Sequence, residues 1–351
     1  MSKPARKHTE PLRTRHVFFD TEVYRRAGFN VSHTAFALLA KEIAAGRIAL
    51  HITDITLAEI HRQLKEMVIE KAAEAKRLAR DFNRIAQITG QQNGTVKEID
   101  GPALADKAWS GFVEKVMTGM NCHSILALEM PPRVVFERYF ARQAPFDESG
   151  SKEFPDAFVV ESLACYCKSN EITMYVVSRD AALRRAAESH DVLIPLQTID
   201  EILAAAAAAP GDEAEIEALV DELFAAPGFD DQVIAAIETD LDFVDFTYYG
   251  DLPEGSVQEA KLEEIVSLDD YRVAAFDGKQ IGLILQVNTI LDATIRYLDE
   301  DKLRDKDDDI ILTELRTSSR THARLKLYVS INLADQRFKE TELLTLDVIV
   351  E

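Results

Sequence analysis

Short apolar runs that end in a polar or acidic residue alternate with stretches of helical spacing through the first 200 residues of this chain. Residues 16–20, for example, read His-Val-Phe-Phe-Asp, which is typical of a central parallel strand with Asp20 at its carboxyl end. Further strands are expected at residues 47–52, 172–180 and 192–196. The expected strand at 172–180 again ends in an acid, Asp180.

In the segments between these strands, apolar residues recur at helical spacing, which predicts helices. We expect helices over residues 34–45, 54–85, 104–120, 131–140, 155–167 and 181–187. The helical stretch between the second strand and Asp156 is expected to form a wall or lid rather than sheet. This order of elements predicts a three-layer α/β/α domain with a mostly parallel sheet.

The sequence pattern of alternating strands and helices stops at an alanine-rich run that ends at Pro210-Gly211. Two short acidic helices are expected next, followed by an α+β domain with an antiparallel sheet. Its candidate strands are residues 257–268, 271–276, 281–290, 323–333 and 343–350, with a turn at Asp269-Asp270 between the first two. We therefore expect a basic arm at 1–14, the α/β/α domain at 15–203, a linker with acidic helices at 204–242 and an acidic β-rich domain at 243–351.

Composition limits the classes of protein that remain. A chain of 351 residues with 47% hydrophobic content can bury one or two cores. Three cysteines are too few for a disulfide framework, and we find no Cys/His set with zinc spacing. The basic N-terminus has no apolar run long enough for a signal peptide or a membrane span. We therefore expect a soluble cytoplasmic protein without a membrane partner.

The net charge of −21 would disfavour nucleic acid if it were evenly spread. Residues 1–200 hold 27 Lys and Arg against 26 Asp and Glu, a net of +1, whereas residues 201–351 hold 13 against 35, a net of −22. The acidity thus belongs to the C-terminal part. The N-terminal part remains compatible with local basic patches that contact phosphate.

Pro155-Asp156 reads as the start of a buried helix, with Asp156 in the first turn. The helix dipole favours a carboxylate there by about 0.3–1 kcal/mol, so a purely structural acid is one interpretation. The other interpretation depends on three further acids: Asp20 and Asp180 at strand ends, and Glu59 near a helix start. Chain topology is expected to bring the four to one edge of the sheet.

Four carboxylates in one pocket repel each other unless cations neutralise them, so the grouping predicts a divalent metal. Oxygen ligands favour Mg²⁺ or Mn²⁺ over zinc. The matching chemistry is phosphodiester hydrolysis with two ions about 4 Å apart.

Four short motifs together resemble the PIN-domain nucleases, over roughly residues 14–200. The motifs are Phe18-Phe19-Asp20-Thr21, Thr56-Leu57-Ala58-Glu59, Pro155-Asp156-Ala157 and Ser178-Arg179-Asp180-Ala181-Ala182-Leu183. The longer segment Lys152-Glu153-Phe154-Pro155-Asp156-Ala157 resembles a PIN-like subgroup with long helical insertions.

The resemblance implies a metal-dependent endonuclease, most often an endoribonuclease of the toxin or defence type, with RNA rather than DNA as substrate. It assigns the metal to Asp20, Glu59, Asp156 and Asp180, and it places Ser178 where the family often has a supporting hydroxyl. Lys152 and Arg179 are candidates for phosphate contacts, with solvated side chains as the alternative. Glu22 stands where many members have Asn, which leaves its role as a ligand, a supporting group or an exposed charge open.

Other functions remain as alternatives. A haloacid-dehalogenase-type phosphatase also begins with an apolar strand and Asp-Thr, but it needs a second aspartate where this chain has Glu22. A nuclease directed at DNA and a non-catalytic binding module of the same fold are further alternatives. We expect the acidic C-terminal domain to mediate oligomerisation or partner docking, with regulation of the nuclease as the other interpretation.

Overall fold

The computed structural model describes residues 5–6, 10–89, 99–146, 153–208, 213–299 and 313–351. The chain divides into two compact units, one of residues 13–201 and one of residues 1–12 together with 202–351. None of the helices in the described ranges combines the length and apolar character needed to cross a bilayer.

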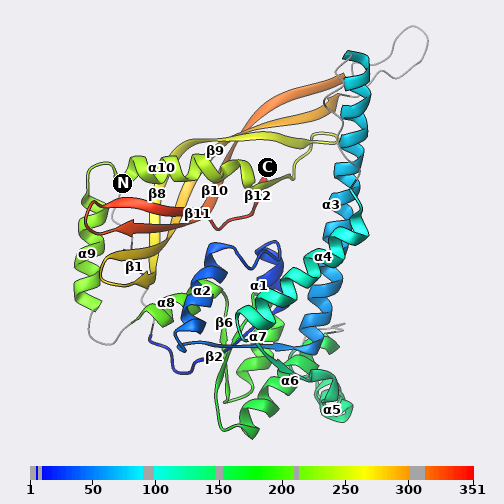
Figure 1. The fold of residues 1–351 in the computed structure, drawn as a ribbon, viewed down its shortest axis with the longest axis vertical. Helices are drawn as coiled ribbons and strands as arrows, with labels where there is room; N and C mark the ends of the chain where they lie inside the picture. The colour runs from blue at the N-terminus through cyan, green and yellow to red at the C-terminus, as the bar shows by residue number, and fades with distance from the viewer. Residues whose placement is uncertain (1–4, 7–9, 90–98, 147–152, 209–212, 300–312) are drawn as a thin grey trace. The chain divides into compact units, whose positions relative to one another are not determined.

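The N-terminal unit is built on a five-stranded parallel sheet with the strand order β4-β3-β2-β5-β6. Figure 1 labels β2 and β6 of this sheet. Its strands are β2 (His16–Phe19), β3 (Ala49–Thr53), β4 (His123–Ile125), β5 (Met174–Val177) and β6 (Leu193–Leu196). The short apolar runs seen in the sequence are therefore buried parallel strands, and the predicted fold class is confirmed.

Helices connect these strands. They are α1 (Thr21–Arg26), α2 (Thr34–Ala44), α3 (Asp54–Thr89), α4 (Gly101–Val113), α5 (Pro132–Phe140), α6 (Phe154–Ser169) and α7 (Ala181–Glu188), with a π-helical turn at Glu114–Gly119 and a 3₁₀ turn, η2, at Ala127–Glu129. A further helix, α8 (Ile199–Ala207), follows β6 and continues past residue 201. Consecutive residues of a strand point to opposite faces of the sheet, and β2 shows how this makes three layers. Phe18 packs in a core with residues of α6 and α7, whereas the ring of Phe19 contacts Tyr24 of α1 and Phe36 of α2.

Strand β4 differs from the sequence prediction. The pattern between β3 and α6 predicts only helices, but His123–Ile125 forms β4 and pairs in parallel with β3. Three residues are too few to show the two-residue period of a strand, so pairing with β3 rather than local pattern defines this strand.

The C-terminal unit contains a second sheet with the order β1-β8-β9-β10-β11. Its strands are β1 (Ala5–Arg6), β8 (Ser256–Phe276), β9 (Gln280–Asp299), β10 (Thr313–Asn332) and β11 (Arg337–Leu343). Strands β8 to β11 form an antiparallel meander, as predicted, while β1 from the expected basic arm pairs in parallel with β8. A separate parallel pair joins β7 (Asp245–Tyr248) and β12 (Asp347–Val350).

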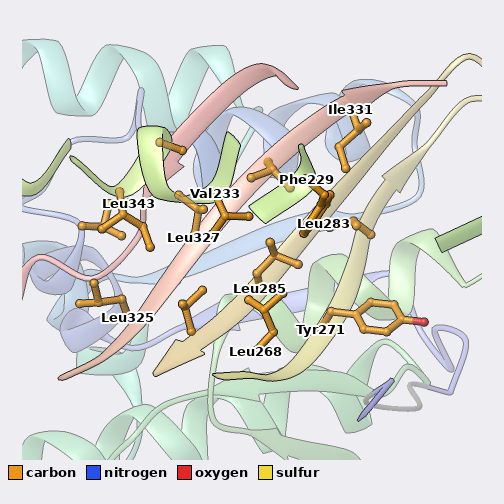
Figure 2. Close-up of a cluster of buried hydrophobic side chains, with 14 of the residues drawn as sticks. Phe229, Val233, Leu268, Tyr271, Leu283, Leu285, Leu325, Leu327, Ile331 and Leu343 are labelled. Atoms are coloured by element: carbon orange, nitrogen blue, oxygen red, sulfur yellow. The ribbon is translucent and has the colours of Figure 1, made fainter. Parts of the chain in front are cut away.

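Two acidic helices, α9 (Glu213–Ala225) and α10 (Phe229–Asp240), complete this unit. Figure 2 shows the apolar core, in which Phe229 and Val233 of α10 lie with Leu283, Leu285 and Leu327 of the sheet. This burial gives the C-terminal unit a core of its own.

The expected turn at Asp269-Asp270 is instead an irregularity within the single long strand β8. The carboxylate of Asp269 accepts hydrogen bonds from Ser267 and from Asn288 of β9. These bonds satisfy the acid inside the sheet, so the strand continues where the sequence suggested a turn.

Candidate active site

Asp20 and Asp180 follow two neighbouring strands of the parallel sheet. Asp20 comes directly after β2 and caps α1, and its backbone N–H donates a 3.0 Å hydrogen bond to the carbonyl of Val177 in β5. Asp180 follows β5 and caps α7. The chain continues from β2 toward β3 and β4 on one side and from β5 toward β6 on the other. The two acids thus lie at the switch point of the sheet, where open α/β folds bind ligands.

Helices supply the other two predicted acids. Pro155 lies in the first turn of α6, where its missing N–H costs no helical hydrogen bond, and Asp156 follows it in the same turn. Glu59 lies in the second turn of α3, which begins at Asp54 directly after β3. Both carboxylates are half-buried.

Asp156 responds to the charges of the other three predicted acids. Burial, reinforced by the charges of Asp20, Glu153, Glu59 and Asp180, raises the pKa of Asp156 to about 8. The pKa of a carboxyl group is raised in this way only by negative charges that lie close to it. The structure therefore brings the four predicted acids into one electrostatic environment.

Asp20 is subject to opposing effects. Burial raises its pKa, and the charges of Glu59 and Glu22 act in the same direction. Hydrogen bonds from the Ser178 hydroxyl and the Thr21 backbone N–H lower it, and the balance leaves the pKa at about 6. Both donors favour the ionised carboxylate, which is the form that binds a cation.

Two buried hydroxyl groups orient these carboxylates. Ser178 Oγ donates a 2.7 Å hydrogen bond to Asp20 Oδ2 and accepts one of 3.0 Å from the backbone N–H of Asp180. Thr21 Oγ1 donates a 2.8 Å hydrogen bond to Glu59 Oε2. Ser178 thereby connects the two strand-end acids, and Thr21 connects the end of β2 to α3.

Asp180 and Glu22 are already engaged with groups of the protein. One oxygen of the exposed Asp180 accepts hydrogen bonds from the backbone N–H groups of Ala182 and Leu183, at 2.6 and 3.0 Å. The half-buried Glu22 forms a 3.0 Å ion pair with Arg26, although its charge still reaches Asp20. Glu22 is thus a neighbour of the pocket that pairs with a cation of its own helix.

Of the two candidate phosphate contacts, Arg179 and Lys152, the structure describes only Arg179. Arg179 is exposed beside Asp180. Lys152 lies outside the described residues. A third basic residue, Arg184, donates a 2.9 Å hydrogen bond to the carbonyl of Ser178 and so supports the loop after β5.

The donor set matches the chemistry of a hard divalent cation. All four acids present carboxylate oxygens, which Mg²⁺ and Mn²⁺ prefer, and their mutual repulsion is what a bound cation would relieve. Within the described parts of the chain, however, no group of three or more His, Cys, Asp or Glu side chains is arranged to hold a metal ion. The chemistry of the residues fits a divalent metal.

Sequence reasoning gave no role to the Thr21 hydroxyl or to Glu153. Thr21 belongs to the Phe-Phe-Asp-Thr motif, but its contact with Glu59 depends on the packing of α1 against α3. Glu153 precedes α6 and acts on Asp156 through its charge. An acid three positions from Asp156 was the only signal available for it.

Comparison with known proteins is informative for the N-terminal unit alone. Residues 17–182 match the family model described as PIN domain, and no family model matches the C-terminal region. No curated protein and no solved structure matches the chain.

Proposed function

We propose that this chain is a metal-dependent endonuclease that hydrolyses phosphodiester bonds, with RNA as its preferred substrate, because residues 17–182 match the family model described as PIN domain. PIN domains are typically nucleases, and they generally use divalent metals such as Mg²⁺ or Mn²⁺. The family thus supports a nucleic-acid hydrolase in general. The metal ligands and the preference for RNA are our proposal.

The observation that carries the proposal is the shared electrostatic environment of the four acids. Asp156 responds to the charges of Asp20, Glu59 and Asp180, although the four come from four different parts of the chain. Crowding carboxylates raises their pKa and costs free energy in a protein that holds no cation. Such an arrangement is typical of a site whose working form includes positive charge.

In this proposal Asp20, Glu59, Asp156 and Asp180 hold Mg²⁺ or Mn²⁺. When bound, the ions supply an activated water and neutralise charge on the leaving oxygen. The protein contributes no nucleophile of its own to this chemistry.

The remaining residues prepare the acids for this role. Ser178 fixes Asp20, and Thr21 fixes Glu59, each by donating a hydrogen bond to a carboxylate oxygen. Donors of this kind hold ligand oxygens in one orientation. Asp156, with a pKa of about 8, holds a proton at neutral pH and must lose it before both of its oxygens can act as ligands.

A cleavage assay tests the proposal. The purified chain is incubated with labelled single-stranded RNA, structured RNA and DNA in the presence of Mg²⁺, Mn²⁺ or chelator. We expect internal cleavage of RNA with either metal and none with chelator. Faster cleavage of DNA would reassign the substrate, and absence of cleavage from all three substrates would support a non-catalytic binding module instead.

The acidic C-terminal unit is proposed to dock a partner or a second copy, or to regulate the nuclease in a toxin or defence setting. Its net charge of −22 over residues 201–351 attracts basic surfaces. Cleavage by the whole chain is compared with cleavage by residues 1–203. Equal rates would reject autoinhibition.

A further inference from the structure

Helix α5 presents aromatic side chains to solvent. Phe136, Tyr139 and Phe140 are 43%, 40% and 77% exposed. We call these three residues the α5 aromatic surface. Large exposed rings in one short helix are unusual, because burying them would stabilise the fold.

The rings are held in fixed positions by one another and by Phe154, the first residue of α6. The ring centroid of Phe154 lies 5.4 Å from that of Phe136 and 5.2 Å from that of Tyr139, and the centroid of Phe140 lies 6.1 Å from that of Phe136. These separations are typical of favourable aromatic pairs. The surface is therefore preformed.

A buried polar network fixes α5 against the rest of the unit. Arg138 forms an ion pair with Glu161 of α6, and its Nη1 donates a 2.6 Å hydrogen bond to the carbonyl of Ala144. The Nε2 atom of His190 lies 3.2 Å from the same carboxylate of Glu161. Because these side chains are mostly buried, the network holds α5 in one orientation relative to α6.

The α5 aromatic surface is continuous with the turn that carries Asp156. Val135 of α5 packs in one buried cluster with Ala157 of α6, and Phe154 is partly buried against that cluster. Residues two apart in a helix project from different sides, so Phe154 and Asp156 lie on opposite sides of the first turn of α6. A helix is about 10 Å wide, which a few nucleotides can span.

An exposed arginine lies at the end of α5, two residues after Phe140. It is Arg142, whereas the guanidinium groups of Arg133 and Arg138 form ion pairs with Glu137 and Glu161. Aromatic rings beside an arginine are a means of binding single-stranded nucleic acid, in which the rings stack on bases and the cation contacts phosphate.

From these observations we infer that the α5 aromatic surface stacks against the unpaired bases of a single-stranded substrate and leads the strand across the start of α6 to Asp156. The inference rests on the proposed nuclease function and names its substrate class. Bases in a duplex are stacked on each other and cannot offer their faces to protein rings. The surface therefore selects single strands over duplexes.

Binding of the full chain to a fluorescent 20-nucleotide RNA, single-stranded or annealed to its complement, tests the inference in chelator. Phe140→Leu keeps an apolar side chain but removes the ring, whereas Phe140→Trp keeps a ring. Stacking predicts about tenfold weaker binding of the single strand by Phe140→Leu and binding within about twofold of wild type by Phe140→Trp. Phe243→Leu is the matched control, because Phe243 is 79% exposed in the C-terminal unit, and it should bind as wild type does.

Two results would overturn the inference: equal affinity of Phe140→Leu and wild type for the single strand, or equal affinity of wild type for the single strand and the duplex. The first result would leave an apolar protein partner as the ligand of this surface. Cleavage is measured on the same RNA with Mn²⁺. Cleavage that does not depend on Phe140 rejects the stacking surface but keeps the nuclease, whereas ring-dependent binding without cleavage rejects the nuclease but keeps the stacking surface.

Discussion

The hydroxyl of Ser178 donates a 2.7 Å hydrogen bond to Oδ2 of Asp20, which connects the ends of two neighbouring strands. This bond lowers the pKa of Asp20 against the opposing effect of burial. It therefore keeps a buried carboxylate available as an anion.

Ser178→Ala is predicted to reduce the cleavage rate about tenfold, the loss typical of removing a group that orients a metal ligand. Without its donor, the carboxylate of Asp20 is no longer fixed in one orientation. The cleavage rate at saturating Mn²⁺ measures the effect. Ser162→Ala is the control, because the buried Ser162 hydroxyl bonds only to a helix carbonyl among the described contacts, and an unchanged rate in Ser178→Ala would contradict the assignment.

Thr21→Val is predicted to weaken activation by the metal. Valine has nearly the shape of threonine but cannot donate the 2.8 Å hydrogen bond to Glu59. About tenfold more Mn²⁺ should be needed for half-maximal cleavage. Thr21→Ser keeps the hydroxyl and should respond to Mn²⁺ as wild type does; if both variants behave alike, the hydroxyl has no role in metal binding.

Asp156→Asn is predicted to abolish cleavage and yet to stabilise the metal-free protein. The folded-state pKa of about 8 exceeds the ordinary value of 3.8, so the folded state holds the Asp156 proton more tightly. The wild type therefore loses stability as pH rises from about 4 to 8. At pH 8 in chelator, the asparagine should raise the melting temperature by about 2–4 °C, the shift for about 1 kcal/mol in a domain of this size.

The control for this experiment is Asp191→Asn, which changes an exposed carboxyl in the same unit. Its melting temperature should match that of wild type throughout the pH range. A lower melting temperature for Asp156→Asn than for wild type at pH 8 would mean that the carboxylate stabilises the fold, contrary to the predicted repulsion.

His51 is predicted to make the fold sensitive to acid. It is buried in β3, 2.9 Å from a ring nitrogen of His16, and burial together with the charges of His16, His123 and Arg15 lowers its pKa to about 3. The unfolded chain takes up this proton near pH 6.5, so stability is fully present above that pH and is lost as pH falls toward 3. His51→Gln should show a smaller fall in melting temperature between pH 7 and 5; an equal fall would exclude His51 as the cause.

The sequence predicted those parts of the fold that have strong local patterns. The strands before Asp20 and Asp180 appear as expected, because burial on both faces of a parallel sheet requires continuous apolar runs. The long helix that carries Glu59 appears as expected because its apolar residues recur at helical spacing. The three residues of β4 and the irregularity at Asp269 depend on partners distant in sequence, so local pattern could not reveal them.

The same limit applies to the site. The four acids could be grouped from topology, since parallel strands place their carboxyl ends at one edge. The bond from Thr21 to Glu59 and the exposure of Phe140 depend on how helices pack, which one sequence does not specify. The catalytic roles of Asp20, Glu59, Asp156, Asp180 and Ser178 stay predictions.

Binding of Mn²⁺ to the full chain at pH 8, measured by isothermal titration calorimetry, tests most directly whether the four acids form a metal site. We predict binding by wild type and by Asp191→Asn, and a loss of about 100-fold or more in affinity for Asp20→Asn and Asp156→Asn. No binding by wild type, or equal affinity in the two site variants and wild type, would contradict the account.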